Sequence, residues 1–218
     1  MKADLHLHTV YSGDSEISIA ALIKSVEHAG LGCVAVVDHN NINGSMELMK
    51  WQPSFKVISG EEIMTQEGEI IGYFLSETVS PGHTPERTIE SIHEQGGLAC
   101  IPHPFDRFRS SAMQVSTLER IVGLIDIVEV ANARTLPFQD LNLPRVFSEK
   151  YCKPMSAGSD AHRPAEIGRC FVDINDFKGP SEFLNCLKSG QVRQYRVGTL
   201  KRTSGLAVRL ARKCIGKH

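Results

Sequence analysis

The chain of 218 residues is 41% hydrophobic and 22% charged, with a formal net charge of −1, as in an ordinary globular protein. This length predicts one large domain with a real core, and the balanced charge argues against a dedicated nucleic-acid binder. No apolar run approaches the ~18 residues of a membrane span, no signal peptide is evident, and the six cysteines form no CxxC pair, so we expect a cytoplasmic protein with reduced thiols.

Strands and helices alternate along the predicted chain. Apolar runs predict strands at 3–8, 32–37, 55–59, 69–75, 98–102, 126–131, 154–157 and 170–174. Helical spacing of apolar side chains predicts helices from 19 to a stop at Gly30, and near 84–95, 116–122, 139–150 and 181–189. Alternating βα units with apolar strands predict a parallel sheet under helices, and about seven such units in one domain suggest a closed barrel. We expect a single domain over 1–198, because no repeat or linker interrupts it.

Polar residues gather directly after these strands. Side chains at i and i+2 of a strand point to one face, so His6 and His8 can hold one ion together, as can Asp160 and His162. Between these pairs, further polar residues follow strands at His39, Glu62, His103 and Asn132. In a β/α barrel the chemistry lies at the C-terminal ends of the strands. Imidazole and carboxylate suit zinc, manganese and iron, and the set exceeds the needs of one tetrahedral zinc, so we expect two or three divalent ions.

Four motifs in chain order resemble those of the PHP domain, the polymerase and histidinol phosphatase family. They are D-L-H-L-H-T-x-x-S at 4–12, Val37-Asp38-His39, His103-Pro104 and Gly158-Ser159-Asp160-Ala161-His162. The resemblance implies a distorted seven-stranded β/α (TIM-like) barrel. It also implies a di- or trinuclear metal centre that hydrolyses phosphate esters.

The resemblance assigns expected roles to individual residues. It places His6, His8 and Asp160 at a first ion, and Asp14 with His39 and His162 at another. In the G-x-E motif of 60–62, it makes Glu62 the bridging carboxylate and leaves Glu61 as an exposed neighbour. Glu69 stands where many relatives have a histidine, and either ligation or an ordinary strand role fits it. The expected metal ligands are therefore His6, His8, Asp14, His39, Glu62, Glu69, His103, Asp160 and His162.

The expected mechanism is direct attack of a metal-bound hydroxide on phosphorus, because no signature of a covalent nucleophile or a Walker loop is present. The expected catalytic residues are Glu62, Asp160, His103 and His39, of which the two histidines could move a proton. Arginines follow the strands at Arg107, Arg109, Arg134 and Arg163. Arg134 lies in a stretch that resembles the family's E-x-x-N-x-R. It is our first choice for binding the substrate phosphate, followed by Arg107.

The last twenty residues differ in character from the rest. After Glu182 the chain has nine Lys or Arg residues and no acid, and a helix over 203–217 would separate apolar from basic side chains. Such a tail at 199–218 can dock on the barrel, which we favour, or hold nucleic acid or an anionic membrane surface.

The expected function is hydrolysis of a small phosphomonoester or a nucleotide. Three alternatives stay open: an exonuclease that uses the same ions on short nucleic acid, a histidinol-phosphate phosphatase, and a non-catalytic metal-binding domain. The near-complete ligand set argues against the last of these.

Overall fold

A single twisted sheet forms the centre of the protein in a computed structural model that describes residues 1–136 and 138–194. Within these residues the sheet has nine strands in the order β7-β6-β5-β4-β3-β2-β1-β8-β9. The strands are β1 (Lys2–Leu7), β2 (Cys33–His39), β3 (Lys56–Thr65), β4 (Gly68–Tyr73), β5 (Leu98–Ile101), β6 (Ile127–Asn132), β7 (Met155–Gly158), β8 (Cys170–Asp173) and β9 (Gln191–Gln194). The helices are α1 (Ile19–Ala29), α2 (Asn43–Lys50), α3 (Pro85–Glu94), α4 (Val115–Ile121), α5 (Leu143–Lys150) and α6 (Pro180–Lys188), with short 3₁₀ turns η1 (Val10–Ser12) and η2 (Pro164–Glu166).

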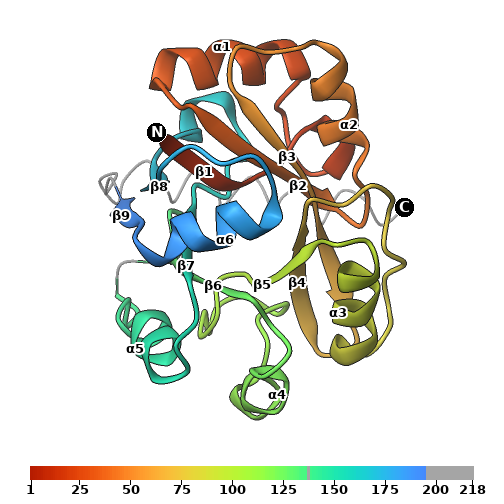
Figure 1. The fold of residues 1–218 in the computed structure, drawn as a ribbon, viewed down its shortest axis with the longest axis vertical. Coiled ribbons are helices and arrows are strands. Elements are labelled where there is room, and N and C mark those ends of the chain that lie inside the picture. Colours follow the sequence, from red (N-terminus) through yellow and green to blue (C-terminus); the bar gives the residue numbers. More distant parts are fainter. Residues whose placement is uncertain (137, 195–218) are drawn as a thin grey trace, which may run out of the picture.

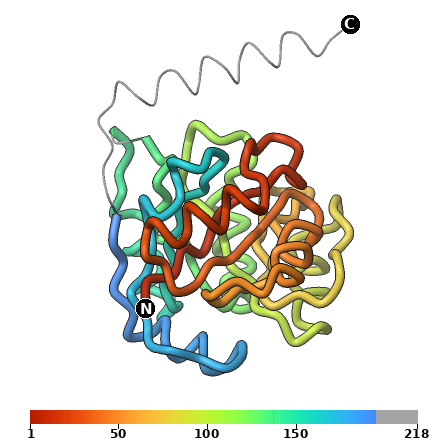
Figure 2. Tube along the Cα trace, turned by 90° about the horizontal axis from the view of Figure 1, so that it is seen from above, coloured from red at the N-terminus to blue at the C-terminus, as the bar shows by residue number. Residues whose placement is uncertain are grey.

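The sheet curls into a nearly closed barrel, because the segment that follows β7, at one end of the sheet, pairs with the end of β1. The amide of Asp160 donates to the carbonyl of His6 at 2.6 Å, and the amide of His8 donates to the carbonyl of Ala161 at 3.0 Å. Gly158 permits this approach, because a Cβ at that position would lie 2.2 Å from the Cβ of His6. Figure 2 shows the start of the chain beside its last described segments.

The Asp4 side chain fastens the first strand to this closure. Its two oxygens accept hydrogen bonds from the amides of Ser159 at 2.8 Å and Gly168 at 2.9 Å. The carboxyl is fully buried, and burial raises its pKa to about 6. Residues more than 150 positions apart in the sequence are therefore tied together beside the barrel seam.

Helices cover the outside of the barrel and one of its ends. In Figure 1, α1 and α2 lie along one side of the strands, α3, α4 and α5 lie on the opposite side, and α6 crosses in front. The barrel interior is filled by small and aliphatic side chains that pack against Phe183 and Leu187 of α6. Burial of such side chains is the main driving force of folding. Because apolar side chains fill the interior and the end that α6 covers, polar residues gather at the opposite end of the barrel.

Two irregularities in the strand pairing decide which side chains enter the barrel at that end. In β1 the register shifts between Asp4 and Leu7, and in β6 it shifts between Glu129 and Ala131. A bulge of this kind re-aims the residues that follow it. Leu5 packs in the barrel interior, yet Leu7 packs outside under the helices. The shift in β1 therefore turns the histidines of the first motif inward.

The expected seven-stranded parallel barrel is wrong in strand count and in strand direction. β4 pairs antiparallel with both neighbours, β8 pairs antiparallel with β1, and β9 pairs antiparallel with β8. β3 continues through Thr65, so only two residues join it to β4, and a connection this short forces a hairpin. The mixed α/β class and the barrel-like closure were predicted correctly.

Two elements were not predicted from the sequence. Helix α2 begins with Asn43-Gly44-Ser45, a run typical of a turn. Gly44 is required there, because a Cβ would lie 1.9 Å from an oxygen of the buried Asp38. Strand β9 has the polar sequence QVRQ and is largely exposed, so it shows no apolar pattern.

The remaining predictions concern the cysteines, membrane-spanning helices and the C-terminal tail. The thiols of Cys33, Cys100 and Cys170 are buried, whereas Cys152 is exposed. Among residues 1–136 and 138–194, no helix combines the length and the apolar character needed to cross a membrane. The predicted tail at 199–218, and the end of the domain predicted to run to 198, lie outside the described residues.

Candidate metal centre

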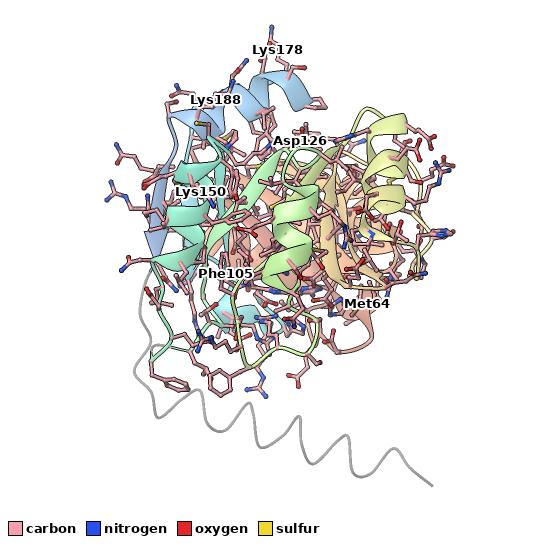
Figure 3. The ribbon with its side chains drawn as sticks, turned by 90° about the horizontal axis from the view of Figure 1, so that it is seen from below. Met64, Phe105, Asp126, Lys150, Lys178 and Lys188 are labelled. Carbon is pink, nitrogen blue, oxygen red and sulfur yellow. The ribbon has the colours of Figure 1, made fainter. Side chains whose placement is uncertain are left out.

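The predicted ligands meet at the end of the barrel opposite α6. In Figure 3, Met64 and Phe105 lie toward one edge of the molecule, whereas Lys178 and Lys188, at α6, lie toward the other. Met64 comes two residues after Glu62, and Phe105 comes two residues after His103. Strand ends thus deliver the polar side chains to the face that α6 does not cover.

Glu62 occupies the centre of this group. Its Oε2 lies 3.5 Å from His6 Nε2 and 3.3 Å from His8 Nε2. The same oxygen lies 3.3 Å from His39 Nδ1, and Oε1 lies 2.9 Å from His103 Nε2. One buried carboxylate therefore faces four imidazoles, from β1, β2 and the loops that follow β1 and β5, which is the geometry a bridging ligand needs.

The ligand atoms form three overlapping groups, and within each group they lie within 4.8 Å of one another. These groups are His6–His8–Asp160, His8–His39–His162 and His39–Glu62–Glu69. Because His8 and His39 each belong to two groups, the groups describe neighbouring positions and not separate sites. This arrangement fits two or three cations held side by side.

Asp14 and His162 complete the group at its open edge. Asp14 Oδ2 lies 3.0 Å from His162 Nε2 and 3.6 Å from His39 Nε2. Side-chain exposure is 36% for Asp14 and 28% for His39, against 1% or less for His6, His8 and Glu62. Solvent therefore reaches the cluster from the side of Asp14.

The donor set fits divalent cations. His6 Nε2 and His8 Nε2 face each other at 3.1 Å, so two groups that each present a lone pair when neutral converge on one point. The buried Oδ1 of Asp160 has no hydrogen-bond partner among the described residues, although it lies 3.5 Å from His8 Nε2. Atoms of this kind are costly to bury unless a cation or a proton satisfies them.

The charges of the cluster shift its pKa values in a consistent pattern. Burial alone would raise the pKa of the Asp160 and Glu62 carboxyls. The positive charges of Arg109 and His6 outweigh burial at Asp160, and those of His6 and His103 outweigh it at Glu62. The pKa of each carboxyl therefore lies well below its usual range. Burial and the neighbouring His162 lower the pKa of His8 to about 3. Both carboxylates are thus ionised and His8 is neutral at pH 7, which are the forms that bind metal.

Glu69 reaches the cluster because β4 runs antiparallel. A strand in this direction brings its first residues, not its last, to the open end of the barrel. Glu69 Oε2 lies 3.4 Å from His103 Nε2, and Oε1 lies 3.7 Å from His39 Nδ1. The structure therefore places the Glu69 side chain beside the other predicted ligands and does not turn it away from them.

Glu61 corrects one expectation. It was expected to be exposed beside the site, but it is fully buried. Successive residues of a strand point to opposite faces, so Glu61 turns away from the barrel interior that Glu62 enters. One oxygen accepts a hydrogen bond from the amide of Val79 at 2.9 Å, and burial raises the pKa of the carboxyl to about 7.

Glu129 is a functional candidate that was not predicted from the sequence. Its Oε1 lies 3.0 Å from His6 Nδ1, and its Oε2 accepts a hydrogen bond from the amide of His103 at 2.6 Å. Histidine ligands commonly bond a carboxylate through the second ring nitrogen, which fixes the ring and its tautomer. The E-x-x-N-x-R stretch contained this residue, but only the bulge in β6 lets both Glu129 and Asn132 face inward.

Two of the four arginines that follow strands, Arg109 and Arg134, contact the cluster. Arg134 Nη1 lies 3.3 Å from the carbonyl oxygen of Asp160 and also contacts His162 Nδ1. Arg109 contacts the carboxylate of Asp160 and, at 3.4 Å, Asn132 Oδ1. The side chain of Arg107, our second choice, is exposed on the same loop. Arg109, and not Arg107, thus lies against the cluster, because its turn is set by hydrogen bonds to Asp106, which the sequence pattern does not reveal.

Other polar residues near the strand ends support the site. Ser12 Oγ lies 3.2 Å from His8 Nδ1 and accepts a hydrogen bond from the amide of His39 at 3.1 Å. Thr9 bonds Asp38, and Asn40 accepts from the amide of Met64. His28, His83 and His93 lie on the surface, as predicted, and His218 lies outside the described residues.

Known proteins share both the sequence and the fold. The sequence profile of the PHP domain matches residues 4–139, and that of the PHP-associated region matches residues 141–192. The chain belongs to the PHP family. Among its relatives, the uncharacterized protein MJ1587 of Methanocaldococcus jannaschii is 45% identical in an alignment of 146 residues that covers 61% of this chain and 82% of that protein. A second protein of that organism, the uncharacterized MJ0417, is 32% identical over 198 residues, which cover 86% of this chain and 79% of the relative.

A solved PHP-like structure confirms the fold. It is a two-domain protein from Bacteroides vulgatus, described as containing a predicted PHP-like metal-dependent phosphoesterase. It superposes with a TM-score of 0.71 at 17% identity, over 89% of this chain and 65% of its own length. The PHP chain described here thus covers less than two thirds of that protein and shares the fold of one part of it.

Proposed function

We propose that this PHP protein is a metal-dependent phosphoesterase that hydrolyses a small phosphomonoester or a nucleotide. The observation that carries the proposal is the carboxylate of Glu62 facing four imidazoles, with Arg109 and Arg134 against the same cluster. Such a site presents cations and guanidinium groups to one point, which suits a tetrahedral anion with several negative oxygens.

The nine ligand residues divide naturally among two or three divalent ions, for which zinc, manganese and iron are the candidates. His6, His8 and Asp160 would hold one position, and His39, Glu62 and Glu69 would hold the next, with His103 beside them. Asp14 and His162 would serve the position at the open edge. When bound, ions of this kind supply an activated water and neutralise charge that develops on phosphate oxygens.

The protein's own groups would orient the substrate and move protons. Arg109 and Arg134 both contact Asp160, so a phosphate bound between them would meet the cluster directly. We propose Arg109, in place of Arg107, as the partner of Arg134 in phosphate binding. Of the two histidines expected to move a proton, His39 exchanges more readily with water, because its side chain is 28% exposed and that of His103 is 1% exposed.

The convergence of all nine expected ligands argues against a decayed, non-catalytic domain, in which some of them would have been replaced. An exonuclease would use the same ions, so substrate trials must separate it from a phosphatase. The test is a screen of the full chain, loaded with manganese or zinc, against phosphomonoesters, nucleotides and short DNA or RNA. Glu62→Gln serves as the inactive control.

Hydrolysis of small esters that Glu62→Gln abolishes is the expected result. Elemental analysis should find at least two ions per chain in the metal-replete protein. Fewer than one ion per chain, together with no hydrolysis of any phosphate ester, would show that the proposal is wrong.

A further inference from the structure

Two phenylalanines are exposed on the loops that carry the site arginines. Phe108 is 65% exposed and Phe138 is 69% exposed, and their ring centroids lie 5.2 Å apart at an interplanar angle of 88°. This edge-to-face contact is one of the geometries that aromatic pairs prefer. Two large aromatic side chains that contact each other yet face solvent are unusual on a globular surface unless something binds there. We call Phe108 and Phe138 the aromatic rim.

Hydrogen bonds between the two loops hold the aromatic rim in place. The side chain of Gln139 accepts from the amide of Arg107 at 3.0 Å and donates to Asp106 Oδ1 at 2.8 Å. The same Asp106 oxygen accepts from the amide of Phe108 at 3.1 Å. The side chain of Gln139, the residue after Phe138, thus joins its loop to Asp106 and Arg107 in the loop that carries Phe108. The pair is therefore positioned by polar contacts and does not depend on the ring contact alone.

The aromatic rim lies within reach of the phosphate position. Phe108 directly precedes Arg109, whose guanidinium contacts Asp160 in the metal cluster. Consecutive Cα atoms are about 3.8 Å apart, so the backbone of Phe108 is separated from Asp160 by little more than the length of one arginine side chain, roughly 10 Å. Phe138 stands four residues after Arg134, which also contacts Asp160. A phosphate bound by both arginines would therefore leave its organic group on the side of the rim.

We propose that the aromatic rim binds a planar aromatic ring in the organic part of the substrate, so that the enzyme selects phosphate esters of the nucleotide type over aliphatic esters. This proposal rests on the proposed phosphoesterase function and adds a substrate class to it. Aromatic faces stack on any planar ring and need no particular hydrogen-bond pattern. The rim therefore selects for a ring as such, while the arginines and the cluster select for the phosphate.

The variant that tests the rim replaces both rings with aliphatic side chains of similar polarity, Phe108→Leu with Phe138→Leu. On the metal-loaded full chain, kcat/KM for adenosine monophosphate and for phenyl phosphate should fall about tenfold, mostly through KM, since stacking of one ring contributes on the order of 1–3 kcal/mol. Hydrolysis of glycerol phosphate should stay within about twofold of the wild type. Phe108→Tyr with Phe138→Tyr keeps both rings and should keep the preference.

A matched control replaces an exposed aromatic residue away from the site. Trp51 at the end of α2 is 55% exposed, and Trp51→Leu should leave kcat/KM unchanged for all three esters. Light scattering on wild type and on the double leucine variant tests whether the rim instead joins two copies of the chain. A wild-type dimer that the double variant dissociates would overturn the substrate proposal.

The outcomes separate this proposal from the one beneath it. If the enzyme hydrolyses phosphate esters but the double variant affects aromatic and aliphatic substrates equally, the rim proposal is wrong and the phosphoesterase function stands. If the metal-loaded wild type hydrolyses none of the three esters, the proposed function fails and the rim proposal fails with it. Selective loss on the two aromatic esters supports both.

Discussion

The two sides of the metal cluster are built differently. On the inner side, His6, His8 and Asp160 are at most 1% exposed, and Glu129 holds His6 from behind. On the outer side, Asp14 and His39 are 36% and 28% exposed. His6 lies in β1, and His8 and Asp160 lie within two residues of the ends of β1 and β7, whereas Asp14 comes from the loop after η1. The comparison indicates a rigid, desolvated inner position and an outer position open to solvent and substrate.

The electrostatics do not follow the same division. On the outer side, the pKa of His39 rises to about 9, because its contacts with Asp14 and the charges of Glu62 and Glu69 outweigh burial. On the inner side, burial and the nearby His162 lower the pKa of His8 to about 3, but the charges of Glu62, Glu129 and Asp160 outweigh burial at His6 and raise its pKa well above the usual range. A bound cation must therefore displace a proton from His39 on the outer side and from His6 on the inner side near neutral pH, whereas His8 is already free to bind. We expect metal binding on both sides to weaken as the pH falls.

Glu62 is the residue that belongs to both sides, so its loss should have the largest effect. Glu62→Gln keeps the shape of the side chain but removes the charge between the four imidazoles. We expect kcat to fall by about a thousandfold or more, which corresponds to ~4 kcal/mol of transition-state free energy. Steady-state kinetics would measure the loss, and circular dichroism should show an intact fold. If Glu61→Gln proves the more damaging change, the bridging role has been given to the wrong glutamate.

Glu129→Gln tests whether the inner side depends on its supporting carboxylate. A glutamine cannot supply the charge that holds His6, and its amide nitrogen can stand against the amide of His103. Changes of this type commonly weaken metal binding by about 10–100-fold. Competition with a chelator would measure the affinity. The exposed Glu119→Gln is the control and should bind metal as the wild type does.

Asp14→Asn tests the outer side and should have a smaller effect. An amide oxygen is a weaker ligand than a carboxylate, but solvent can replace it at an exposed position. We expect one ion per chain to be lost or to bind about tenfold more weakly, while the inner ions stay bound. Elemental analysis after dialysis gives the stoichiometry. Loss of all the ions would mean that the two sides bind metal as one cooperative unit.

Glu61→Gln should have the smallest effect on activity, within about twofold, because Glu61 lies on neither side of the cluster. Its effect appears in stability. The pKa of Glu61 is about 7 in the folded protein against an ordinary 4.5, so the folded state binds the extra proton between these values. The resulting penalty is absent below about pH 4.5 and complete above about pH 7, so stability falls as pH rises through this window.

The Glu61→Gln variant does not lose this stability at high pH, because its side chain stays neutral. The difference in unfolding free energy between Glu61→Gln and the wild type should therefore shift in favour of the variant as pH rises from 5 to 8, by on the order of 2 kcal/mol. Chemical unfolding of the metal-free proteins at several pH values measures it. A difference that is flat with pH would show that Glu61 is ionised at no cost in the folded state.

Much of the cluster could be predicted because ligand spacing and strand ends are local properties of the sequence. The i, i+2 pair of His6 and His8 and the four ordered motifs contain six of the nine expected ligands, and these six lie together in the cluster. The unpredicted features depend on tertiary contacts. The direction of β4 depends on how far β3 extends, and the inward turn of Glu129 depends on a bulge that no residue type marks.

The arginine choice shows the same limit of local patterns. Arg107 and Arg109 have the same residue type and lie two positions apart, so no local pattern in the sequence tells them apart. The turn held by Asp106 sends Arg109 toward Asp160 and leaves Arg107 at the surface. Likewise, Glu61 and Glu62 differ only in which face of β3 they occupy, and the motif alone identified Glu62.

The barrel seam has a consequence for the order of assembly during synthesis. The first strand supplies His6 and His8, but its partners across the seam are Ser159, Asp160 and Ala161, which leave the ribosome much later. Contacts with so large a separation along the chain are slow to form, because a long loop must close first. A nascent chain that ends before Asp160 lacks a complete ligand group for the inner position. The inner group of ligands is therefore completed only late in synthesis, once the segment after β7 has joined β1 across the seam.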